Sequence, residues 1–173
     1  MYGGAGSKER EGQAAAFVEG NYARLAILAT VLSGNEHDGA DLLHGTLERL
    51  YAKWKGAEVE KPWALAKTIM VRLNIDRYRK HRREQLTGAA PDGAVLVSFD
   101  HDDRLVEAVR LLPARQRTAV VLRYFEDMAL DDIARTMGCS QGTVRSHLSR
   151  GLATLRTALS DLEDDSMESG TQT

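Results

Sequence analysis

The sequence TVRSHLSRGLATLR, residues 143–156, gathers three arginines and one histidine without a single carboxylate. If this segment is helical, five residues from position 142 onward recur at i, i+3, i+4, i+7 and i+8 and share one face. These residues are Gly142, Arg145, Ser146, Ser149 and Arg150. Guanidinium groups donate paired hydrogen bonds to guanine, and short hydroxyl side chains let a helix approach DNA closely. The spacing therefore predicts a DNA-binding face.

The elements that position this face have the pattern of a helix-turn-helix. Apolar residues of the basic helix are spaced four, four, three and four apart, which predicts a buried stripe: Val144, Leu148, Leu152, Leu155 and Leu159. The preceding segment LDDIARTMGCS, residues 130–140, has the features of the first helix and the turn. These features are the apolar Leu130, Ile133 and Met137, the small Ala134, a glycine that can end the helix, Gly138, and an N-cap, Ser140.

In a helix-turn-helix the second helix enters the major groove and presents its early residues to the bases. We expect base contacts from Arg145, Ser146, Ser149 and Arg150. Thr143 and His147 are expected nearer to phosphate, with Gln141 on the same outward side. A solvated basic face on an ordinary helical hairpin is the alternative. Ala129 stands where a capping side chain would stabilise the first helix of the motif.

Amphipathic periodicity along the whole chain predicts an all-α fold of two small helical domains joined by a flexible linker. The chain has 173 residues, of which 43% are hydrophobic and 28% charged, as is typical of soluble globular proteins. The predicted helices are 13–32, 38–55, 62–83, 101–112, 113–124, 130–137 and 141–159. The predicted divisions are a disordered N-terminus (1–12), a first domain (13–84), a linker (85–100), a second domain (101–160) and an acidic disordered tail (161–173).

Several classes of function find no support in the composition. No apolar run approaches the roughly 20 residues of a membrane span, and the N-terminus lacks a secretory signal, so we expect a cytoplasmic protein. Cys139 is the only cysteine, and the histidines are scattered, which predicts no disulfide, no metal site and no cofactor. No Ser/His/Asp grouping or phosphate-binding loop is apparent, which argues against an enzyme.

A second basic segment, RLNIDRYRKHRRE at residues 72–84, carries six lysine or arginine residues against two acids. Clustered cations of this kind bind phosphates. Acidic stretches at residues 100–107 and 161–168 would repel a polyanion or shield a basic face, but the pattern favours solvated helix ends.

Residues 102–159 resemble region 4 of the extracytoplasmic-function (ECF) sigma factors of bacterial RNA polymerase, in the sigma-70 superfamily. The segment that carries the resemblance is LLPARQRTAVVLRYFEDMALDDIARTMGCSQGTVRSHLSRGLATLR. Region 4 of that family reads the minus-35 promoter element. Residues 17–83 are similar to region 2: DLLHGTLERLYAKW resembles the helix that docks on the polymerase clamp, and PWALAKTIMVRLNIDRYRKHRRE the part that melts and reads the minus-10 element. The Leu-Tyr-x-x-Trp pattern and the short linker fit the SigE-like subgroup best.

The resemblance implies a promoter-specificity subunit whose partners are core RNA polymerase, through its β′ clamp and β flap, promoter DNA and, in many relatives, an anti-sigma factor. The residues it places at the clamp are Asp41, Leu42, Leu43, His44 and Leu47. The residues it places at the minus-10 element are Trp63, Lys67, Arg72, Asn74, Arg77 and Arg79. Two positions depart from the family pattern, since His44 replaces a usual glutamine and Arg72 a frequent asparagine.

The segment TVRSHLSR also resembles the DNA-binding end of LuxR-type regulators, which act without docking on core polymerase. In that interpretation the first half would be a sensing or dimerising domain. Such a domain would need strands and a phosphoacceptor pocket or a glycine-rich loop, whereas this half is predicted to be helical and to end in a basic stripe. The pattern favours the sigma factor.

Overall fold

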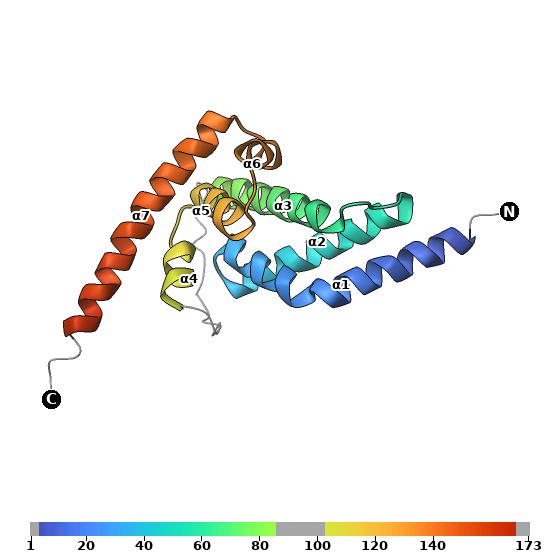
Figure 1. Ribbon diagram of the computed structural model, residues 1–173, viewed down its shortest axis with the longest axis horizontal. Coiled ribbons are helices and arrows are strands. Elements are labelled where there is room, and N and C mark those ends of the chain that lie inside the picture. Colours follow the sequence, from blue (N-terminus) through green and yellow to red (C-terminus); the bar gives the residue numbers. More distant parts are fainter. Residues whose placement is uncertain (1–3, 86–102, 169–173) are drawn as a thin grey trace.

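The computed structural model describes residues 4–85 and 103–168, and over these residues it contains helices and no strand (Figure 1). Three helices form the first bundle: α1 (Gly4–Ser33), α2 (Glu36–Gly56) and α3 (Pro62–Gln85). The second bundle comprises α4 (Asp103–Arg110), α5 (Ala114–Val120), the π-helical turn η1 (Val121–Phe125), α6 (Leu130–Met137) and α7 (Gln141–Glu168). The all-α prediction is confirmed. Beyond Gln85, the predicted linker lies outside the described residues.

Some helices end at positions other than those predicted. Helix α1 begins at Gly4 and α7 continues to Glu168, so helix covers most of the two ends that were expected to be disordered. Local propensity does not explain these extensions, because residues 4–12 (GAGSKEREG) include three glycines and residues 160–168 (SDLEDDSME) include three aspartates and two serines, which are weak helix formers. The predicted helix 113–124 is divided, because α5 passes into η1, and a residue with positive φ, Asp127 (47°), follows.

The core of the first bundle forms where α1 and α2 pack side by side. The side chains of Leu25, Leu32 and Leu50 are fully buried. A Cβ at Gly39 would lie 2.8 Å from the Cα of Thr30, so only glycine permits this close approach of the two helices.

Helix α1 meets the length and composition of a membrane span over Lys8–Ser33, a test that the core helix of a soluble protein also passes. Leu25, Ala29 and Leu32 on this helix are fully buried. Trp54 of α2 is also buried, with its ring centroid 5.6 Å from that of Phe17 on α1. The C-terminal half of α1 thus packs as part of a folded bundle, whereas residues 8–20 are mostly exposed.

The two bundles contact each other. Helices α4 and α5 of the second bundle touch α1, and α5 and α6 touch α3 (Figure 1). Arg117 of α5 is buried at this junction and donates to main-chain oxygens at the end of α1. In this structure the two predicted domains are therefore packed together.

Candidate nucleic-acid interface

The helix-turn-helix has the predicted local geometry. Gly138 ends α6 in the left-handed conformation, with φ 65° and ψ 44°. The Ser140 hydroxyl accepts a 3.1 Å hydrogen bond from the main-chain N–H of Thr143 as α7 begins. Ile133, Ala134 and Met137 are buried between the helices. These interactions fix the angle at which α7 leaves the turn.

The face of α7 that packs on the second bundle is the predicted apolar stripe. Val144, Leu148 and Leu155 are buried, and Leu152 and Leu159 pack partly buried against the same core. Gly151 lets α5 approach closely, because a Cβ there would lie 2.9 Å from Val120 Cγ2. The opposite side of α7 is thereby turned outward.

The outward side of α7 is the predicted basic face, and α7 lies along one edge of the molecule (Figure 1). Its exposed members are Gly142, Arg145, Ser146, Ser149 and Arg150. Gln141 Nε2 donates to Asp131 Oδ1 over 2.5 Å, and Gln141 Oε1 lies 3.4 Å from Arg145 Nη2. We call the exposed residues Arg145, Ser146, Ser149 and Arg150 the α7 basic face. Its placement agrees with direct access to DNA.

His147 is half-buried on the flank of this face. Burial lowers the pKa of His147 below its ordinary 6.5, and the positive charges of Arg115 and Arg150 lower it further. The imidazole is therefore neutral at pH 7 in the free protein. A phosphate contact at neutral pH would use the imidazole N–H as a neutral donor.

Helix α6 has no side-chain cap at its N-terminus, and we expect that adding one would raise the free energy of unfolding. Ala129 occupies the N-cap position, with no side-chain hydrogen bond to the helix. Ala129→Ser should raise the free energy of unfolding by about 1 kcal/mol, because a hydroxyl there can accept from an unpaired N–H of the first turn. Urea unfolding would measure the change. The matched control is Ala153→Ser at an exposed interior position of α7, which should be neutral or slightly destabilising; equal effects at both positions would contradict the capping argument.

The predicted minus-10 residues fall into three groups by the direction of their side chains. The side chains of the first group are exposed to solvent. Arg72 and Arg79 of α3 are exposed. Arg72 lines a cavity of about 450 Å³ together with Arg49 and Lys53 of α2, and among the residues described its lining holds three cations and no carboxylate. We call Arg49, Lys53 and Arg72 the α2–α3 basic groove. Arg49 and Lys53 were missed at the sequence level, although their spacing of four on α2 places both on one side of that helix.

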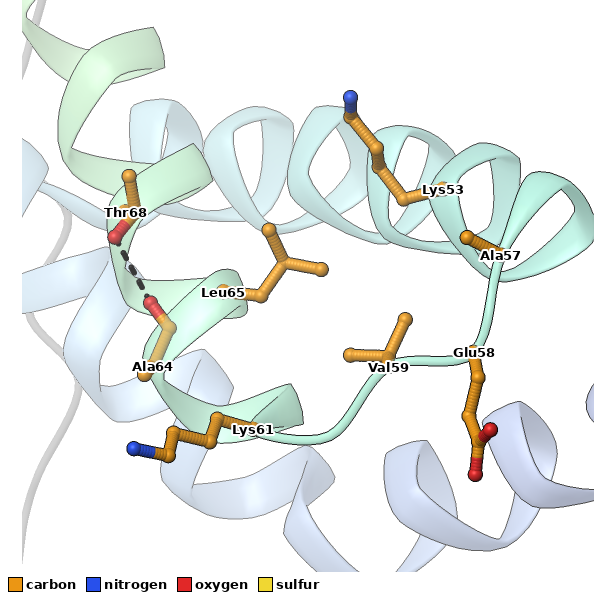
Figure 2. Close-up of a pocket in the computed structure, with 8 residues that line it drawn as sticks. All are labelled: Lys53, Ala57, Glu58, Val59, Lys61, Ala64, Leu65 and Thr68. Atoms are coloured by element: carbon orange, nitrogen blue, oxygen red, sulfur yellow. Dashed lines mark hydrogen bonds between the residues drawn. The ribbon is translucent and has the colours of Figure 1, made fainter.

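An apolar pocket adjoins this groove at the turn between α2 and α3. It has a volume of about 410 Å³ and shares Lys53 with the groove. Figure 2 shows Leu65 and Val59 pointing toward each other across the pocket, whereas the amino groups of Lys53 and Lys61 point away from it. The pocket thus offers an apolar surface bordered by two cations, Lys53 and Lys61, and by the carboxylate of Glu58.

The second group of minus-10 residues points inward. Asn74 is buried, and its side-chain amide donates to the carbonyl oxygen of Leu32 over 3.0 Å. Arg77 donates to Asp38 Oδ1 at 2.9 Å and to Asp41 Oδ2 at 3.3 Å. The prediction that Asn74 contacts DNA does not agree with its burial, and the Arg77 charge is already neutralised by two carboxylates. The helical period of α3 explains this, because Asn74 lies one turn after the buried Met70.

The third group, Trp63 and Lys67, faces the second bundle. Both contact Glu126, which follows η1: Trp63 Nε1 donates to Glu126 Oε2 over 2.9 Å, and Lys67 Nζ lies 3.1 Å from the same oxygen. Arg24 of α1 completes the cluster, with its guanidinium 4.0 Å from the centre of the Trp63 ring and 3.3 Å from Glu126 Oε1. These side chains are therefore engaged within the protein.

The predicted clamp residues divide between core and surface. Leu42 and Leu43 are buried in the first bundle, so they belong to the core among the apolar residues that were expected to divide between core and interface. They lie on the helical period of the α2 core residues Gly39, Thr46, Leu50 and Trp54. Asp41 and His44 are exposed, Leu47 is half-buried, and His44 Nε2 lies 3.2 Å from Glu48 Oε1.

Within residues 4–85 and 103–168, no three histidine, cysteine, aspartate or glutamate side chains are grouped so that they could hold a metal ion. Cys139 is a free, half-buried thiol inside the turn of the helix-turn-helix. Burial raises its pKa, which disfavours the reactive thiolate.

Fold and site together define a helical protein with a helix-turn-helix and separate basic surfaces on its two bundles. The family model described as "Sigma-70, region 4" matches residues 102–155. The RNA polymerase sigma-E factor of Streptomyces antibioticus is 36% identical over 138 residues, which cover 76% of this chain and 77% of that protein. The ECF RNA polymerase sigma factor SigW of Bacillus subtilis is 28% identical over 75% of this chain and 79% of that protein.

The fold is also found in a solved structure. The sigma factor RpoE of Bartonella quintana, in complex with the anti-sigma factor NepR, superposes with a TM-score of 0.69 at 24% identity, covering 84% of this chain and 95% of that chain. This chain belongs to the ECF sigma factors of the sigma-70 superfamily. The relatives span both bundles, which favours this family over the LuxR-type regulators.

Proposed function

We propose that this protein binds core RNA polymerase in the cytoplasm and directs initiation at promoters with minus-35 and minus-10 elements, without catalysis of its own. The single observation that carries the proposal is the exposed α7 basic face on a capped helix-turn-helix, in a chain whose relatives are RNA polymerase sigma factors. The proposed domain bounds remain 13–84 and 101–160, although α1 begins earlier, at Gly4, and α7 ends later, at Glu168.

The α7 basic face reads the minus-35 element in this proposal. Arg145 and Arg150 are exposed and long enough to reach guanine edges in the major groove. Ser146 and Ser149 lie between the two arginines on this face, and their short side chains let the helix approach the bases closely. Thr143 is half-buried at the start of α7, where its main-chain N–H already bonds Ser140, and it suits a phosphate contact at the rim of the groove.

The α2–α3 basic groove and the neighbouring apolar pocket serve the minus-10 element. Three cations hold the phosphates of a displaced strand, and an unpaired base can bury its ring against Val59 and Leu65. Arg79 extends the cationic surface along α3. Trp63 and Lys67 would join this surface once Glu126 releases them.

The exposed side of α2 is proposed to meet the polymerase clamp. Asp41, His44 and the half-buried Leu47 present a carboxylate, an imidazole and an apolar side chain along this helix. Leu42 and Leu43 support the surface from the core. The β flap and an anti-sigma factor are further proposed partners, by analogy with the family and with the RpoE–NepR complex.

Reconstitution with core polymerase tests this function. Core enzyme from the organism that carries the gene would transcribe fragmented genomic DNA with and without the purified chain, and RNA 5′ ends would be sequenced. We expect a small set of start sites that depends on the chain, each preceded by two shared sequence elements. Failure of the chain to associate with core polymerase, measured by gel filtration, would contradict the proposal.

A further inference from the structure

Arg77 of α3 lies against the start of α2, where it binds two carboxylates of the first bundle. Its Nη2 donates to Asp38 Oδ1 at 2.9 Å and to Asp41 Oδ2 at 3.3 Å, while its Nη1 donates to the main-chain oxygen of Asp38 at 3.0 Å. The Arg77 side chain is only 28% exposed. Because a guanidinium presents its donors in a rigid planar fork, these three bonds hold the first two turns of α2 against α3.

Asp38 is also held by the N-cap of α2. Asn35 Nδ2 donates to Asp38 Oδ2 over 2.7 Å, and Asn35 Oδ1 accepts from the main-chain N–H of Asp38 over 2.8 Å. The next residue, Gly39, lies so close to Thr30 of α1 that a Cβ would meet its Cα at 2.8 Å. The start of α2 is therefore fixed by its own cap and by α1, so the loss of Arg77 would chiefly release Asp41.

Asp41 belongs to the side of α2 that is proposed to meet the polymerase clamp. Its side chain is 61% exposed although Arg77 binds Oδ2, and the exposed His44 follows one turn later on the same side of the helix. A partner that donates to a mobile carboxylate has to immobilise that side chain on binding, which weakens association. Arg77 lowers this loss, because it holds Asp41 in one orientation before the polymerase binds.

The surroundings of Arg77 differ from those of Arg79, an outward cation of the same helix. The Arg79 side chain is 57% exposed and lies 3.9 Å from Asp76, whereas Arg77 is shared by two carboxylates of α2. A separation of two residues turns the two arginines to opposite sides of α3, since each residue advances the helix by about 100°. The charge of Arg77 is thus directed toward α2.

We propose that Arg77 is a positioning residue for the docking of core polymerase, which acts by orienting the Asp41 carboxylate toward the clamp. The inference rests on the proposed function and assigns Arg77 to the polymerase side of the first bundle instead of the minus-10 element. A promoter contact from Arg77 would require it to leave both aspartates, which would expose two uncompensated carboxylates to the phosphates of DNA.

A double-mutant cycle on the affinity for core polymerase tests this role. Arg77→Gln should weaken the affinity of the full chain about fivefold, which corresponds to about 1 kcal/mol. Asp41→Ala should weaken it about tenfold, because the contacting carboxylate is lost. The double variant should bind like Asp41→Ala alone, since Arg77 then has no carboxylate to orient. Biolayer interferometry with immobilised core enzyme, at one fixed salt concentration, measures all four chains.

Two controls separate the orientation of Asp41 from effects of charge and folding. Arg104→Gln removes the same charge from the exposed surface of α4 and should leave the affinity for core polymerase within about twofold. Circular dichroism checks the helices of each variant. Arg77→Lys, which keeps the charge but not the fork, replaces Arg77→Gln in the cycle if the glutamine variant unfolds.

Binding to DNA gives a second measurement, made without polymerase. The probe is a mixed-sequence single strand of about 30 nucleotides, and fluorescence anisotropy gives its affinity over a range of salt concentrations. Each phosphate contact that is lost lowers the slope of log affinity against log salt by about 0.7 on a single strand. Arg79→Gln should lower the slope by about this amount, whereas Arg77→Gln should leave the slope unchanged.

Losses that multiply to about 50-fold in the double variant would overturn the inference, because Arg77 would then act independently of Asp41. A lower salt slope for Arg77→Gln would make Arg77 a phosphate contact, and an equal loss of core affinity in Arg104→Gln would reduce the effect to charge; either result would also overturn it. The unmodified chain tests the proposed function separately. If it does not bind core polymerase the proposed function is wrong, whereas normal binding with multiplying losses overturns only the role of Arg77.

Discussion

Replacing both arginines of the α7 basic face, Arg145→Ala with Arg150→Ala, should reduce initiation by the holoenzyme by at least about 30-fold while leaving its affinity for core polymerase unchanged. The reason is that each bidentate arginine–guanine pair is worth about 1–3 kcal/mol of discrimination, so two pairs contribute at least about 2 kcal/mol. Both side chains are exposed, and neither supports the core of the second bundle. Run-off transcription at promoters identified by reconstitution measures the loss.

The matched control for this prediction is Arg104→Ala with Arg156→Ala. Both arginines are exposed, and the pair removes the same charge from α4 and from a later turn of α7. Because these residues lie outside the α7 basic face, the control should change initiation by no more than a few-fold through general electrostatics. Equal losses in the two double variants, or a parallel loss of core binding in the first, would show that the reading face is assigned incorrectly.

Gly34→Ala should destabilise the protein by about 2–5 kcal/mol. Gly34 has φ 91°, which costs a residue with a Cβ about 1–2 kcal/mol. The added Cβ would also lie 2.1 Å from Arg117 Nη1 and 2.7 Å from its Cζ. The guanidinium would have to move and lose hydrogen bonds to the end of α1, which adds about 1–3 kcal/mol. Thermal unfolding of the free chain measures the sum.

Gly138→Ala provides the control for backbone strain alone. Gly138 also has positive φ, 65°, but a Cβ there meets nothing within 4 Å. It should cost only about 1–2 kcal/mol. In an Arg117→Ala background the additional cost of Gly34→Ala should disappear, because the obstructing side chain is absent. Equal costs for the two glycines in the unmodified chain would mean that Arg117 does not hold this position.

The helix-turn-helix could be predicted from the sequence because its determinants are local. The period of Val144, Leu148 and Leu155, the left-handed glycine and the cap at Ser140 act within a few residues of one another. Such signals lie within one short segment and can be recognised without the tertiary structure. The same period on α2 marks Leu42 and Leu43 as core residues, whereas the family resemblance placed the whole segment near the clamp without saying which apolar side chains are buried.

The contacts between the two bundles could not be predicted, because they join residues far apart in the chain. Glu126 meets Trp63 across 63 positions, and Arg117 meets Leu32 across 85. Nothing in the segment FED, residues 125–127, indicates that its glutamate will be covered by two cations and an indole. Asn74 similarly resembles a DNA-contacting residue of a basic helix until its burial against the end of α1 is known.

Photo-cross-linking within one holoenzyme–promoter complex would show whether the two bundles read two separate promoter elements. A cross-linking amino acid would be placed at Ser146 on the α7 basic face in one preparation and at Ala52, which lines the α2–α3 basic groove, in another. We expect cross-links from position 146 at the minus-35 element and from position 52 at the minus-10 element, about 25 base pairs apart. Cross-links from both positions to the same element, or a cross-link to DNA from only one of them, would contradict this division of promoter reading between the bundles.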